Sequence, residues 1–143
     1  MIESLIRDRL LSLGPVTALV VDRVFMLRVQ QGATMPAVRV QEIDEDAPKH
    51  WRGPVGFVKT RIQVDAFAKT YAEAQALASA IHGDGLGPNA TGLDGFMGEL
   101  GGSPATARVH CVDRALRRTG FEPDELRLVR IQQDYMVEWT ALE

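Results

Sequence analysis

The segment KTRIQVDA, residues Lys59–Ala66, alternates polar and apolar side chains. Successive side chains of an extended strand point to opposite faces, so Ile62 and Val64 share one face while Arg61 and Asp65 share the other. This period of two predicts a strand with one buried face and one polar face. The polar face consists of Lys59, Arg61, Gln63 and Asp65.

The segment that follows, TYAEAQALASAI (Thr70–Ile81), has the pattern of an amphipathic helix. Thr70 at the expected N-cap and the later Glu73 have the spacing of a capping box. The apolar stripe consists of Tyr71, Ala74, Leu77, Ala78 and Ile81. This strand and helix carry no nucleophile, metal cluster or phosphate loop, so we interpret them as a scaffold for assembly rather than for chemistry.

The part of the chain before this unit contains one clear helix and two strand patterns. Apolar residues recur there at helical spacing up to Gly14-Pro15, namely Ile2, Leu5, Ile6, Leu10 and Leu13. Val16–Asp22 fits either a short helical turn or an apolar connection. Val24–Val29 and Pro36–Ile43 are expected to be strands, and the acidic, proline-containing Asp44–Pro54 is expected to be a loop.

The part after the helix begins with a glycine-rich insert at about residues 83–106, which holds most of the 13 glycines. Strand patterns return at Ala107–Ala115 and Arg127–Ala141, where Gln133 interrupts the apolar face and is interpreted as a bulge. The order of elements predicts a single domain, residues 1–143, of the α+β class. We expect a mainly antiparallel sheet of about four to five strands with two helices packed on one face.

The composition is that of an ordinary soluble domain, with 45% hydrophobic and 24% charged residues. The formal charge of −3 gives no electrostatic case for binding nucleic acid or an anionic membrane. The N-terminal residues 1–13 contain charges among their apolar side chains and match neither a signal peptide nor a membrane span. We therefore expect assembly in the cytoplasm.

Residues that carry chemistry are sparse and scattered. Cys111 is the single cysteine, so no intrachain disulfide forms, and we interpret it as a small core residue. His50, His82 and His110 are far apart and have no second ligand at metal-binding spacing. The sequence therefore predicts no catalytic, metal or cofactor site.

A set of short segments carries a family resemblance and runs in order along most of the chain. The segments are IESLIRDRLL (2–11), DRVF (22–25), MPAV (35–38) within Gly32–Val40, RIQVDAFA (61–68), YAEA (71–74) with Leu77-Ala78, and the closing EWT (138–140). The step from RIQVDAFA into TYAEA is the most distinctive of them. In this order they resemble the phage tail-completion family, also called tail terminators or tail-to-head joining proteins. The glycine-rich insert is longer than the family's usual connection at that place.

The resemblance implies an architectural function without catalysis or a cofactor. Proteins of this family form a hexameric ring that caps the tail tube of long-tailed phages and of related particles such as gene transfer agents. The ring stops tube polymerisation and joins the tail to the head. The implied partners are further copies of the chain in a homo-hexamer, the tail tube protein and a head–tail connector or stopper, with DNA passing the lumen without sequence-specific binding and with no membrane. The implied location is the head-proximal end of the tail in the virion, after assembly in the host bacterial cytoplasm.

The candidate assembly interface consists of Arg61, Gln63 and Asp65 on the strand, Trp51 as an aromatic anchor, and Phe96 and Met97 in the glycine-rich insert. Each part has an alternative interpretation. The polar strand face is also what the wet side of a monomer's sheet looks like, and Trp51 is equally able to fold back onto its own domain. The glycine-rich insert fits a loop that orders on contact with the tube or a neighbour, or a disordered surface insertion.

Two other functions compete with a tail terminator. One is another head–tail neck component, such as a stopper or adaptor with a related small fold. The other is a small-molecule-binding α+β domain, which requires convergent polar groups in a pocket. The sequence shows no such cluster, so the first alternative is the nearer one.

Overall fold

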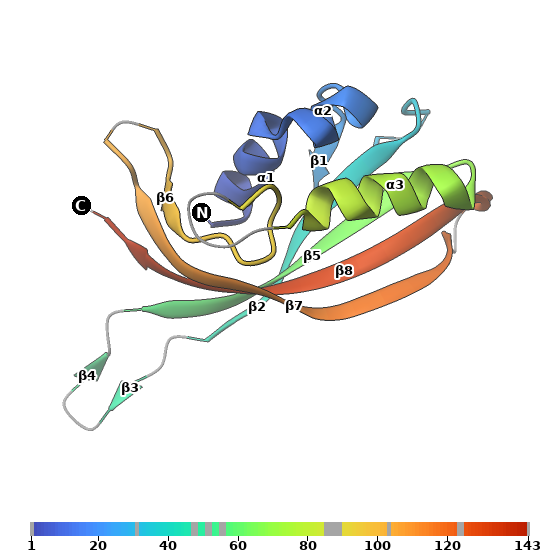
Figure 1. Ribbon diagram of the computed structural model, residues 1–143. Helices are drawn as coiled ribbons and strands as arrows, with labels where there is room; N and C mark the ends of the chain where they lie inside the picture. Colours follow the sequence, from blue (N-terminus) through green and yellow to red (C-terminus); the bar gives the residue numbers. More distant parts are fainter. Residues whose placement is uncertain are drawn as a thin grey trace.

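The computed structural model shows helices packed over one side of a curled sheet (Figure 1). It describes residues 2–30, 32–46, 49–50, 53–54, 57–84, 90–102, 104–122 and 125–142. The elements are α1 (Ile2–Ser12), α2 (Gly14–Val20), β1 (Val24–Met26), β2 (Ala37–Asp46), β3 (Lys49–His50), β4 (Gly53–Pro54), β5 (Val58–Ala68), α3 (Tyr71–His82), β6 (Gly98–Leu100), β7 (Ala107–Glu122) and β8 (Glu125–Ala141).

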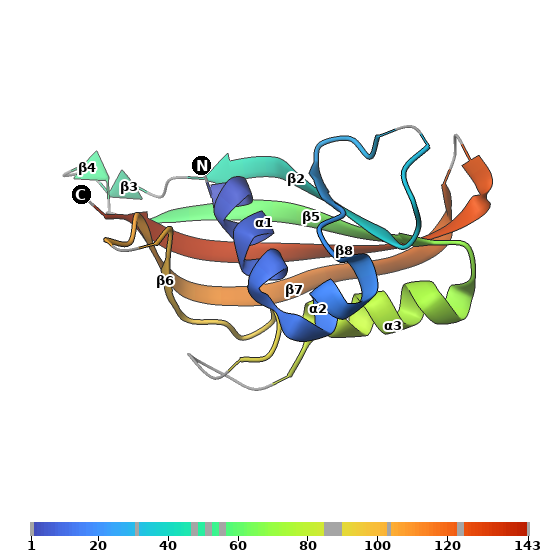
Figure 2. The same ribbon diagram turned by 90° about the horizontal axis from the view of Figure 1, so that it is seen from above.

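The main sheet has six strands in the order β1-β2-β5-β8-β7-β6, and β3 pairs separately with β4. Strand β1 runs parallel to β2, and the other pairings are antiparallel. Seen from above in Figure 2, α1 crosses over the strands while α3 runs along them. Helix α3 contacts β5 and β8, and α1 contacts β1 and β2. The fold is therefore α+β with a mixed sheet whose pairings are mainly antiparallel.

The predicted element count was too low. We expected about four to five strands and two helices, whereas the described residues form three helices and a six-stranded sheet with a separate strand pair. The second helix, α2, takes up the ambiguous segment and has Pro15 in its first turn, where a missing N–H is tolerated. The predicted loop Asp44–Pro54 contains the end of β2 and the β3–β4 pair. The short edge strand β6 lies in the glycine-rich insert.

The core lies between the helices and one face of the sheet. On β5 the alternation predicted from the sequence is confirmed, because Ile62, Val64 and Ala66 are fully buried. Facing residues of β8 and the helices close the core, among them Leu10, Leu77, Ile81, Ile131, Tyr135 and Val137. Tyr71 is an exception to the predicted helix stripe, because it lies on the first turn of α3 and is 55% exposed.

The predicted bulge at Gln133 is wrong. Gln133 pairs with Val64 in an unbroken β5–β8 register and points inward, where its side chain is fully buried. The register shifts instead in β7, between Val109 and Cys111 and again between Arg114 and Leu116. Each bulge bends its strand and increases the local twist. We attribute part of the curl of this long strand in Figure 1 to them.

The predicted N-cap of α3 is confirmed. Thr70 has extended dihedral angles, and its Oγ1 accepts a hydrogen bond from the backbone N–H of Glu73 at 3.2 Å. We expect Thr70→Ala to lower the free energy of unfolding by about 1 kcal/mol, because one N–H of the first turn loses its acceptor. Urea denaturation followed by circular dichroism measures this loss. Thr70→Ser keeps the acceptor and is the control, so an equal loss in both variants would contradict a capping role.

Candidate assembly surface

The side of the sheet that faces away from the helices is rich in polar side chains, although Phe67 and Met136 also lie on it, and we call this side the outer face. It is built by three neighbouring strands, β2, β5 and β8, because alternate residues of each strand point away from the core. Its members are Arg39, Lys59, Arg61, Gln63, Asp65, Arg130, Gln132, Asp134 and Glu138. Figure 1 shows no helix over this side of the sheet.

Asp65 is the centre of one half of the outer face, and its side chain is fully buried. Its Oδ2 accepts hydrogen bonds from Arg39 Nε at 2.9 Å and from Gln63 Nε2 at 2.8 Å. Arg130 Nε lies 3.6 Å from Oδ1, which has no hydrogen-bond partner among the described residues. A buried carboxylate is costly unless it is paired. The two arginines, from β2 and β8, therefore hold Asp65 in place from both neighbouring strands.

Asp134 is the centre of the other half. Its Oδ2 accepts hydrogen bonds from Arg61 Nε at 2.9 Å and Arg61 Nη2 at 2.7 Å, and its Oδ1 accepts one from Gln132 Nε2 at 3.1 Å. Gln132 in turn accepts a hydrogen bond from Arg130 Nη2 at 2.6 Å. Arg130 thus joins the two halves into one network. Such a network fixes side-chain rotamers before any partner arrives.

The structure brings Arg61, Gln63 and Asp65 together on this face, as the strand pattern predicted. They differ in access, because the Arg61 side chain is 35% exposed whereas that of Asp65 is fully buried. Arg61 and Gln63 are therefore the members of this trio that reach the surface. Trp51 lies outside the described residues.

Phe96 and Met97 lie away from this trio, in the segment between α3 and β7. Phe96 is buried in the core and Met97 is 49% exposed. The Arg9 guanidinium lies 3.7 Å from the Phe96 ring centroid and donates to the carbonyls of Ala90, at 3.0 Å, and Gly92, at 2.9 Å. Residues 90–96 are thus docked on α1 within a single chain. Whether this segment touches a tube or a neighbour stays a prediction.

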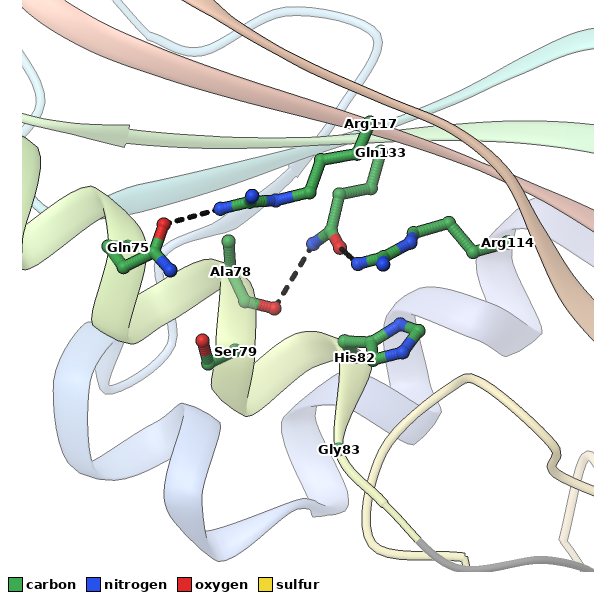
Figure 3. A pocket seen from close by; sticks show the side chains of 8 residues that line it. All are labelled: Gln75, Ala78, Ser79, His82, Gly83, Arg114, Arg117 and Gln133. Carbon is green, nitrogen blue, oxygen red and sulfur yellow. Dashed lines mark hydrogen bonds between the residues drawn. The ribbon is translucent and has the colours of Figure 1, made fainter.

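A pocket of about 270 Å³ lies between α3 and β7 (Figure 3). It is lined by Gln75, Ala78, Ser79, His82, Gly83, Arg114, Arg117 and Gln133. At its base Gln133 Nε2 donates to the Ala78 carbonyl at 3.1 Å, and Gln133 Oε1 accepts from Arg114 Nη1 at 2.9 Å. Arg117 donates to the Gln75 side chain. This pocket was not predicted from the sequence, although the polar Gln133 on an apolar strand face was a signal of it.

The pocket has a positive electrostatic character. Burial lowers the pKa of His82 below its usual range, and the neighbouring charge of Arg114 lowers it further, against the opposing effect of Asp94. His82 is therefore neutral at pH 7, with Nδ1 3.2 Å from the Tyr135 hydroxyl and Nε2 3.6 Å from Asp94 Oδ2. The two guanidinium groups are the charges that an incoming ligand meets.

Cys111 is not the core residue that the sequence predicted. The first bulge of β7 places it half-buried, with Sγ 3.1 Å from Asp113 Oδ2. Burial, together with that hydrogen bond and the carboxylate charge, raises the pKa of the Cys111 thiol to about 11.

This raised pKa predicts slow alkylation of the native chain. At pH 8 we expect iodoacetamide to label Cys111 at least about tenfold more slowly than in the urea-unfolded chain, because the thiolate is the reacting form. The protonated thiol favours the folded state below its unfolded pKa, and this contribution is lost as pH rises through about 11. Mass spectrometry of labelled protein across pH 7–11 measures both rates. Equal rates in the folded and unfolded chains would contradict the raised pKa.

The residues that the structure describes carry neither a cluster of metal ligands nor a helix fit to span a membrane. No group of three or more His, Cys, Asp and Glu side chains there is arranged to hold a metal ion. None of the described helices combines the length and apolar character needed to cross a membrane.

Comparison with known proteins places the chain in a family. The sequence profile described as "Tail completion protein gp17" matches residues 4–84, more than half of the chain. A search of curated proteins found no match. Among solved structures, a chain from a structure described as "Virion of native gene transfer agent (GTA) particle" has a similar fold, with a TM-score of 0.63 and 16% identity over 96% of this chain and 93% of that one. The chain therefore belongs to the tail completion protein gp17 family and is a structural protein of a phage-type tail.

Proposed function

We propose that the chain is a tail terminator that forms a homo-oligomeric ring, of six copies, on the head-proximal end of a tail tube. The ring stops tube polymerisation and presents its other side to a head–tail connector. The observation that carries this proposal is the family match over residues 4–84, in a family named for tail completion. The likeness of fold to a chain from a gene transfer agent virion supports the architecture.

The proposed mechanism is geometric. A tube grows by heterologous addition, in which one surface of a subunit binds a different surface of the next. A ring that matches the last tube ring on one side, but does not reproduce a tube subunit on the other, ends that series. Such a ring needs rigid subunits. The pre-formed ion pairs Arg39–Asp65 and Arg61–Asp134 on the outer face provide rigidity on the side without helices.

We propose further that the outer face is an assembly surface. Arg61 and Gln63 reach the surface there, and Lys59 and Glu138, 3.6 Å apart, are more exposed still. Mixed charges of this kind fix the register between partners more than they raise affinity. Met97, which is 49% exposed in the segment between α3 and β7, is a second candidate contact.

Purified chain and purified tail tubes test the function. We expect light scattering to give the mass of a closed oligomer and negative-stain electron microscopy to show rings with a central hole. On addition of tubes, we expect rings at one tube end and no further growth when tube subunits are supplied. Rings that bind neither tube end would reject a terminator and favour another neck component. A chain that stays monomeric both free and on tubes would reject both.

A charge swap tests the outer face without removing its ion pair. Arg61→Glu/Asp134→Arg keeps an intrachain pair but reverses the charges that a partner meets. We expect the swap to abolish ring formation at concentrations where the wild-type chain assembles. The control is Arg7→Asp/Asp8→Arg on α1, which swaps an exposed pair on the helical side. If the outer-face swap assembles as well as the control, the outer face is scaffold only.

A further inference from the structure

The pocket between α3 and β7 is cationic, and its lining residues include no anionic group. Two of its eight lining residues are arginines, Arg114 and Arg117, and none of the eight is a carboxylate. Neither arginine has an ion pair with another described residue within 4.0 Å. Asp94 is not one of the lining residues, and its Oδ1 accepts a hydrogen bond from the backbone N–H of Arg114 at 3.0 Å.

The two guanidinium groups are oriented by neutral amides. Arg114 donates to Gln133 Oε1, and Gln133 is itself fully buried and held by the Ala78 carbonyl and the Tyr135 hydroxyl. Arg117 donates to the side chain of Gln75 on α3 (Figure 3). An amide accepts a hydrogen bond without cancelling the charge, and a guanidinium has five N–H groups to donate. Both arginines therefore keep donors and charge available in fixed positions.

Carboxylate is the ligand chemistry that fits this arrangement. The planar fork of arginine matches a carboxylate in a bidentate manner, and a pocket of about 270 Å³ has room for the end of an acidic side chain. Duplex DNA, by contrast, is bound through several phosphates at once along a basic surface. One recess with two cations, in a chain of net charge −3, does not offer such a surface.

The same chain carries an exposed acidic segment on the other side of the sheet. The end of β2, Asp44, Glu45 and Asp46, is exposed, and none of the three has an ion pair among the described residues. In the sheet order, β5 and β8 separate β2 from β7. A head-to-tail ring requires two different, complementary patches at separate places on one subunit. The pocket and the acidic end of β2 meet that requirement.

We propose that the Arg114–Arg117 pocket of one copy binds the acidic end of β2, Asp44–Asp46, of the next copy in a ring. This inference rests on the proposed ring and identifies a contact within it. The bound carboxylate replaces the water around both guanidinium groups, and repetition of the contact closes the ring. The contact weakens with added salt, because it depends on charges at the surface.

Charge reversal on each side, and then on both, tests the contact in the full chain. We expect Arg114→Glu/Arg117→Glu and, separately, Asp44→Arg/Glu45→Arg each to weaken self-association about tenfold or more in sedimentation velocity. A chain with all four changes has opposite charges facing again, and we expect its association to recover to within about threefold of wild type. Arg28→Glu, an exposed reversal in the connection after β1 and outside both the pocket lining and the outer face, is the control and is expected to leave association unchanged.

The outcomes separate this contact from the function it serves. Thermal melts, together with the neutral variant Arg114→Gln/Arg117→Gln, show whether a loss of association reflects unfolding. The proposed contact is wrong if the reversals leave the rings intact. It is also wrong if self-association in the variant with all four changes falls by the sum of the two separate losses instead of recovering. Neither result contradicts the proposed function as a tail terminator. If pocket reversal lowers only the affinity for duplex DNA, the pocket is a nucleic-acid site and the proposal fails. If the wild-type chain never self-associates, either free or on tubes, both the proposed ring and the proposed contact within it are rejected.

Discussion

Asp65→Ala is expected to destabilise the chain by about 2–4 kcal/mol, among the largest effects of a single polar substitution here. The side chain of Asp65 is fully buried, and its removal leaves the guanidinium groups of Arg39 and Arg130 without their shared carboxylate. Breaking a buried pair from one side costs about 3–5 kcal/mol. We expect slightly less, because the two arginine side chains are 20% and 23% exposed and remain partly hydrated.

An exposed ion pair of similar geometry provides the control. Glu99 accepts from Arg108 at 2.7 Å, but both side chains are more than half exposed. Glu99→Ala should therefore cost less than about 1 kcal/mol. Chemical denaturation of both variants at pH 7, in low and high salt, measures the difference. If Asp65→Ala were as mild as Glu99→Ala, the outer-face network would not be a source of stability.

The elements that were predicted correctly are those whose pattern is local. The alternation of β5 and the capping box of α3 depend on neighbours within a few residues, and both are confirmed, with Ile62 and Val64 fully buried and Thr70 as the N-cap. Strand β1 lies within the predicted strand Val24–Val29 but ends at Met26, whereas β6, with three residues, is too short for a periodic signal and was not predicted. Their place in the sheet depends on pairing with β2 and β7, and the local sequence does not specify which strands pair.

The candidate surface was predictable on one strand only. The sequence placed Arg61, Gln63 and Asp65 on one face, but their partners Arg39 and Asp134 come from β2 and β8. Those partners depend on the register between strands, which no local pattern specifies. The pocket was not predicted for a related reason. In the sequence, Gln133 interrupts the apolar face of its strand. Only the packing of α3 against β8 shows that its side-chain amide donates a hydrogen bond to the Ala78 carbonyl.

The second large effect is expected at Gly92, where the glycine-rich insert meets the end of α3. A Cβ on Gly92 would lie 2.5 Å from the carbonyl oxygens of both Ile81 and His82, and 2.6 Å from the backbone nitrogen of Gly83. These are backbone atoms at a helix end, so no side chain can rotate away. The same carbonyls accept the N–H groups of Leu93, at 2.9 Å, and Asp94, at 3.2 Å.

Gly92→Ala must therefore separate this segment from α3 and withdraw the fully buried Leu93 from the core. Loss of a buried leucine costs about 2–5 kcal/mol, and we expect Gly92→Ala to lower the free energy of unfolding by about 3–5 kcal/mol. Gly120→Ala on β7 is the matched control, because a Cβ there meets nothing within 4 Å. It should be neutral or stabilising by up to about 1 kcal/mol. Denaturant titration gives both values, and hydrogen exchange at the Leu93 amide should rise in Gly92→Ala alone. Equal stability of the two variants would mean that the close approach of residues 83 and 92 is not required by the fold.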